Sequence, residues 1–175
     1  MQGKLVGKTL LTARVYEPKD KSLGIDFLRE HPVTTHPELY REVKSGRRQV
    51  RNRVVTNAYV NLLVDELQAN QATHSDFKYH DSGTGTVAEA AGDTALGTPC
   101  GEARDTGTQV EGATANVYKS VATHTYAGTF AITEHGLFNA ATVGTLMDRS
   151  VFSAINVVSE NQIQWTYELT VSSGG

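Results

Sequence analysis

The six histidines are the first residues in this chain that could do chemistry, because histidine can bind a metal ion or carry a proton near neutral pH. They are His31, His36, His74, His80, His124 and His135. No two have the spacing of a metal-binding pair on a helix, and none has the Cys/His spacing of a zinc site. His124 and His135 fall on neighbouring expected strands, where they could approach each other. We interpret these strand histidines as surface or half-buried residues and expect no metal site.

Two further patterns could indicate a cofactor or an active site. The stretch from Gly83 to Ala88 hints at a dinucleotide-binding loop, but no βαβ pattern surrounds it, so a tight turn is the better interpretation. Glu134 and Arg149 could form a catalytic carboxylate and an anion clamp, although we favour a cross-strand ion pair. No serine stands in a Gly-x-Ser-x-Gly elbow. We therefore expect no catalytic residues, no enzyme activity and no cofactor.

The basic run is the one charged constellation that suggests a binding site. It consists of Lys44, Arg47, Arg48, Arg51 and Arg53, five cations in ten residues. These cations could neutralise phosphates, but no aromatic side chain is interleaved for base stacking. They could equally contact an acidic protein surface, because arginine suits carboxylates, or they could form a solvated face. We favour a protein interface over nucleic acid.

The charge distribution divides the chain at about residue 56. Residues 1–56 hold 12 Lys/Arg against 6 Asp/Glu, and residues 57–175 hold 4 against 13. Prolines interrupt residues 17–50, which show no long apolar period. We therefore predict that residues 1–56 form an extended basic N-terminal arm ordered by contacts with neighbouring molecules. An arm packed on its own domain is the alternative.

The remaining residues predict a β-sandwich body, 57–175, that contains one helix. Apolar residues recur at helical spacing over about 57–69, with Thr56 or Asn57 as the cap, and predict a largely buried helix. Residues 81–103 predict a long surface loop. Strands are expected over 117–126, 129–138, 145–157 and 162–172.

The clearest strand signal is the alternation in residues 162–171. Ile163, Trp165, Tyr167, Leu169 and Val171 share one face of a strand. One apolar and one polar face indicate an antiparallel sandwich or barrel. Hairpin loop lengths place Ile132 opposite Val151, Glu134 opposite Arg149, Ile155 opposite Trp165 and Val151 opposite Leu169. The expected fold class is mainly β: an antiparallel, jelly-roll-like β-sandwich with one buried helix and an extended N-terminal arm.

Composition adds two expectations. The chain has no run of 18 apolar residues, so we expect no membrane span. Its single cysteine, Cys100, has no partner for an internal disulfide, which fits a reducing compartment.

The C-terminal third resembles structural proteins of tailed bacteriophages. The resemblance covers about residues 117–172 and is clearest over Ile132–Ala140 and Gly144–Phe152. It implies a virion component made in the host cytoplasm, with no enzymatic activity and no cofactor.

Together with the expected arm, the resemblance favours a capsid decoration (cement) protein. Its expected partners are the major capsid protein and neighbouring copies of itself. The alternatives are a tail, collar or fibre component and, second, a carbohydrate-binding sandwich domain.

Overall fold

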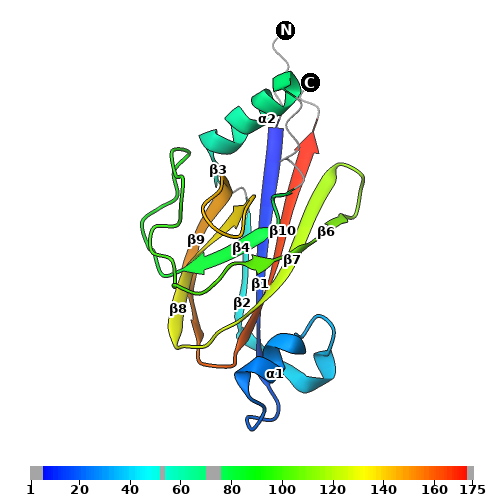
Figure 1. Cartoon of the computed structure of the whole chain (residues 1–175), viewed down its shortest axis with the longest axis vertical. Coiled ribbons are helices and arrows are strands. Elements are labelled where there is room, and N and C mark those ends of the chain that lie inside the picture. Colours follow the sequence, from blue (N-terminus) through cyan, green and yellow to red (C-terminus); the bar gives the residue numbers. More distant parts are fainter. Residues whose placement is uncertain (1–5, 52–53, 70–75, 173–175) are drawn as a thin grey trace.

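The computed structural model describes residues 6–51, 54–69 and 76–172. In this part of the chain, ten strands form two five-stranded sheets whose pairings are all antiparallel (Figure 1). The strand order of sheet A is β2-β1-β10-β7-β6, and that of sheet B is β3-β9-β8-β4-β5. The mainly β, antiparallel architecture expected from the sequence is confirmed.

Sheet A joins the first third of the chain to strands from its second half. Its strands are β1 (Val6–Pro18), β2 (Tyr40–Arg51), β6 (Thr108–Glu111), β7 (Val117–Thr125) and β10 (Gln162–Ser172). Sheet B consists of β3 (Val54–Val55), β4 (Tyr79–Gly83), β5 (Asp105–Thr106), β8 (Phe130–Phe138) and β9 (Leu146–Val157). The helices are α1 (Ile25–Glu30), the 3-10 turn η1 (Pro37–Leu39) and α2 (Asn57–Ala69). Neither α-helix in the described residues is long and apolar enough to cross a membrane.

The main core lies between the two sheets. Ile163 and Trp165 of β10 pack in one cluster with Ile132 of β8 and Ile155 of β9. The alternation in β10 therefore correctly predicts its buried face, although Val171 at the end is 39% exposed.

The expected hairpin pairings are only partly right. β8 pairs with β9, but two irregularities in the ladder place Glu134 opposite Val151 and Gly136 opposite Arg149. β9 and β10 do not pair, because the chain crosses from sheet B to sheet A between them. The shared face of Ile132, Ile155 and Trp165 was nevertheless predicted correctly, since the inner faces of both sheets line the same core.

The prediction of a separate N-terminal arm is wrong for the described residues. β1 lies between β2 and β10 in the interior of sheet A, and Leu11, Ala13 and Val15 are buried. The segment that follows is fastened to the same sheet: the side chain of Gln162 accepts a hydrogen bond from the Val33 N–H and donates one to the Leu28 carbonyl. Burial of the alternating apolar side chains of β1 stabilises the fold, whereas an extended arm would leave the same side chains in water.

The bounds predicted for the helix are confirmed, but its expected burial is not. Thr56 caps α2 by accepting a hydrogen bond from the Tyr59 N–H. Tyr59 is buried, whereas Val60, Val64 and Leu67 are 48%, 47% and 88% exposed. The helix covers one end of the sheets with a single face (Figure 1).

Candidate functional site

As far as Arg51, the basic run lies on β2, at one edge of sheet A. Between Val43 and Arg48 the ladder to β1 is interrupted, and residues 44–47 stand opposite Arg14 alone. We call residues 44–47 the β2 bulge. Gly46 is required there, because a Cβ on it would lie 2.4 Å from Cγ2 of Val15. The bulge thus packs closely on β1 and carries two of the predicted site residues, Lys44 and Arg47, both exposed.

Arg48, the third predicted site residue, is engaged within the chain. Its guanidinium donates to the carbonyls of Ser45 and Arg47 in the bulge, at 2.9 and 3.0 Å. It also donates to the carbonyls of Ser153 and Ala154 on β9, at 3.2 and 2.8 Å. Arg48 therefore ties the bulge to sheet B and is not available to a partner in the way that Lys44 and Arg47 are.

Of the last two predicted site residues, Arg51 and Arg53, the structure describes only the backbone of Arg51. Arg53 lies outside the described residues, as does the side chain of Arg51, the final residue of β2. The structure therefore brings Lys44 and Arg47 of the bulge together with the adjacent Arg48 on β2, whereas Arg51 is described only by its backbone pairing with Leu10.

A buried pair of histidines on β4 and β8 of sheet B contacts Ser120 on β7 of sheet A and so links the two sheets. Nδ1 of His80 lies 3.0 Å from Nε2 of His135, and Nε2 of His80 lies 2.9 Å from Oγ of Ser120. Nδ1 of His135 has no hydrogen-bond partner. The arrangement is best satisfied when His135 donates to His80 and His80 donates to Ser120, since the unpartnered atom is then a lone pair and not a buried N–H.

Burial keeps both histidines of this pair neutral. Burial lowers the pKa of His80 to about 3 and the pKa of His135 well below its ordinary value, with a further lowering by His80. His80, Ser120 and His135 are each no more than 1% exposed. A substrate has no route to this Ser–His arrangement, and its role is to connect the sheets.

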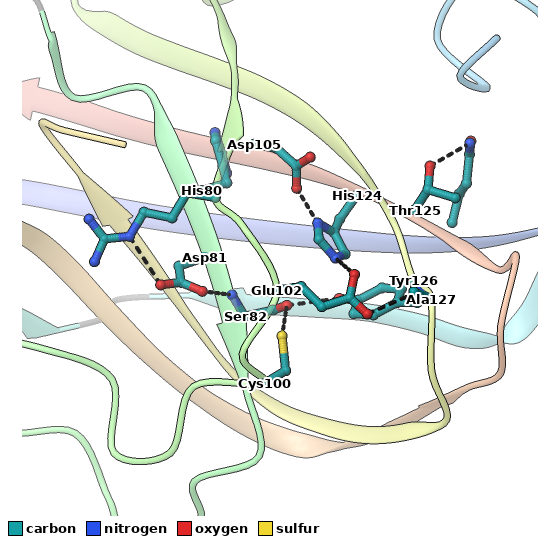
Figure 2. Close-up of polar contacts among 12 residues, drawn as sticks. His80, Asp81, Ser82, Cys100, Glu102, Asp105, His124, Thr125, Tyr126 and Ala127 are labelled. Carbon is teal, nitrogen blue, oxygen red and sulfur yellow. Dashed lines mark hydrogen bonds and ion pairs between the residues drawn. The ribbon is translucent and has the colours of Figure 1, made fainter. Parts of the chain in front are cut away.

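His124 sits in a different environment, between two carboxylates (Figure 2). Its Nδ1 pairs with Asp105, and its Nε2 lies 3.0 Å from Glu102, whose other oxygen accepts the Ala127 N–H. Burial alone would lower the pKa of His124, but the two carboxylates raise it overall. His124 and these two carboxylates therefore form a clasp that holds the start of β5 and the residues just before it against the end of β7. His124 does not meet His135, contrary to the sequence-based possibility.

An open depression of ≈ 500 Å³ lies beside this clasp. Its lining includes Arg29, Glu102, Asp105, Thr123 and His124. Both ring nitrogens of His124 are occupied by carboxylates on opposite sides of the ring, so the three groups do not converge on a metal ion. Within the described ranges, no group of three His, Cys, Asp or Glu residues could hold one.

Near this clasp, the polar side chains of Ser82, Tyr126 and Cys100 form hydrogen bonds with one another. Ser82 lies 3.0 Å from the hydroxyl of Tyr126 and 3.6 Å from the sulfur of Cys100 (Figure 2). Burial raises the pKa of Cys100, so its thiol stays protonated near neutral pH. The buried histidine and cysteine contacts join distant loops and strands, and no sequence spacing could have revealed them.

Glu134 and Arg149 form the ion pair expected from the sequence, but it is buried. Their carboxylate and guanidinium are 2.7 Å apart, and Glu134 also accepts the N–H groups of Gly85, Gly97 and Thr98. Burial alone would raise the pKa of Glu134, whereas these donors lower it overall. The pair is thus the anchor of the loop between β4 and β5, with no open position for a substrate.

Comparison with protein-family models, with curated proteins and with solved structures finds no match.

Proposed function

We propose that this chain is a non-enzymatic structural protein of a virion, in first place a capsid decoration protein that binds the major capsid protein and neighbouring copies of itself. One observation supports this best. The β2 bulge displays Lys44 and Arg47 at the edge of sheet A, and hydrogen bonds from Arg48 tie the bulge backbone to β9. A pre-organised contact of this kind is weak alone and effective when it is repeated many times by symmetry.

The fold is compatible with this role. Two antiparallel sheets with one shared core support a β-sandwich. Consecutive strands β1 and β2 pair within one sheet, so the proposal does not extend to a jelly roll. Attachment in this proposal comes from the surface of the folded body and not from the extended arm that the sequence suggested.

The other candidate functions receive less support. A carbohydrate-binding domain needs exposed aromatic side chains, but the chain's one tryptophan, Trp165, is 1% exposed, and Phe27, at 40%, is the one exposed aromatic residue among those described. A tail, collar or fibre component would use the same fold, and copy number separates it from a decoration protein.

The test is the abundance of the chain in purified particles produced from a genome that carries its gene. Quantitative densitometry against the major capsid protein should find hundreds of copies per particle. A handful of copies would support the tail, collar or fibre alternative. Absence from the particles would overturn the proposal of a virion protein.

A further inference from the structure

We propose that Arg14, Lys44 and Arg47 form one cationic docking surface for carboxylates on a neighbouring protein subunit. This inference rests on the proposed function and names the contact residues and the chemistry of the partner. Arg14 was not among the residues predicted from the sequence.

The pairing of β1 with β2 places the three cations side by side in sheet A. Ala13 lies opposite Arg48 and Val15 opposite Val43, so Arg14 stands opposite the whole β2 bulge. Ala13 and Val15 are buried, and alternation therefore places Arg14 on the outer face of the sheet. Residues 30 or more positions apart in the sequence thus share one surface.

The side chains of these three cations form no ion pair within the described part of the chain. Arg41 pairs with Glu17 and Arg149 pairs with Glu134, but none of the three has an acidic partner there. Lys44 and Arg47 are exposed, and Arg14 is half-buried. Arg48 is the positioning residue, because its hydrogen bonds to Ser45 and Arg47 fix the backbone that carries the other two.

Charge favours protein carboxylates over nucleic acid. The chain has a net charge of −3, so the rest of the molecule carries −6 once these three cations are set aside. A stiff DNA duplex extends beyond the docking surface and meets that repulsion, whereas carboxylates on a protein surface or on a flexible polypeptide can approach the docking surface alone. Arginine also binds carboxylates in a planar, two-pronged geometry.

The first experiment treats purified particles with a carbodiimide, which couples lysine amines directly to carboxylates. We expect mass spectrometry to find Lys44 joined to an Asp or Glu of another subunit, and the K44R variant to lose this product. Cross-links from other lysines, such as the exposed Lys21, with none from Lys44 would overturn the inference.

The second experiment does not depend on particles. It measures binding of the purified chain to immobilised poly-L-glutamate and to double-stranded DNA at low salt. The K44E/R47E variant is compared with K21E/R29E, which makes the same change in net charge near α1. Reversing two charges in the docking surface should weaken poly-L-glutamate binding by about tenfold, with little change in the control.

Thermal unfolding checks that both variants are folded. Equal losses in the two variants, or preference of the unmodified chain for DNA, would overturn the inference. If the chain is absent from particles but keeps selective binding to poly-L-glutamate, the virion proposal fails and the docking surface stands.

Discussion

Arg47 and Arg48 are neighbours of the same type with opposite roles. The guanidinium of Arg48 donates hydrogen bonds to four carbonyl groups and so joins the β2 bulge to β9. The side chain of Arg47 is exposed, with no acidic partner in the residues described. Sequence alone could not separate them, because both stand in one basic run and the separation depends on the bulge.

Arg48→Ala should therefore lower the free energy of unfolding, whereas Arg47→Ala should not. The loss at Arg48 should be about 1–3 kcal/mol, since charged hydrogen bonds to backbone carbonyls disappear. The change at Arg47 should stay within about 0.5 kcal/mol. Urea unfolding of the two variants measures the difference, and equal losses would contradict the structural role of Arg48.

The positions of helices and strands were easier to predict from the sequence than the pairing of the strands. The bounds of α2, β8 and β10 follow from periodicity and agree with the expected ranges to within a residue or two. Pairing failed where the chain changes sheets, since loop length does not reveal such a crossing. β2 was missed because its inward residues Val43 and Val50 are separated by the bulge, which breaks the period of two.

The bulge itself should be intolerant of a larger residue at position 46. Gly46→Val would place methyl groups against Val15, where even a Cβ is too close. Overpacking of this kind costs about 1–3 kcal/mol. Thermal unfolding of G46V measures this loss, with Gly92→Val as the control because a Cβ at Gly92 meets nothing within 4 Å. A G46V variant as stable as G92V would contradict the close packing.

The loop between β4 and β5 should loosen when its buried anchor is removed. Glu134→Gln replaces one carboxylate oxygen by an NH2 group, which then faces either the N–H groups of Gly85 and Thr98 or the N–H group of Gly97. It also leaves Arg149 with Asp93 as its acidic partner. Breaking a buried ion pair costs about 3–5 kcal/mol. Hydrogen exchange of the loop amides should accelerate in E134Q and stay unchanged in the exposed control Glu111→Gln. Unchanged protection in E134Q would mean that the loop is held by other contacts.

At the scale of the whole molecule, the buried histidines make contributions to stability that depend on pH in opposite directions. His80 and His135 are neutral when folded and have depressed pKa values, so the unfolded chain binds protons that the folded chain does not. Stability from this pair is present above pH 6.5 and is lost as pH falls below it. His124 has a raised pKa, so its contribution is present below pH 6.5 and is lost as pH rises through the folded value.

Stability should therefore reach a maximum near neutral pH and fall on both sides. Between about pH 6.5 and 5 most carboxylates remain ionised, and the fall should approach about 1.4 kcal/mol per pH unit for each buried histidine. His135→Phe keeps a ring against Trp165 and removes one of these titrating groups, so it should flatten the acid side while lowering stability at pH 7. His124→Gln should instead flatten the alkaline side. Urea unfolding between pH 5 and 9 measures all three proteins, and an acid slope unchanged in H135F would show that carboxylates, not the buried pair, set it.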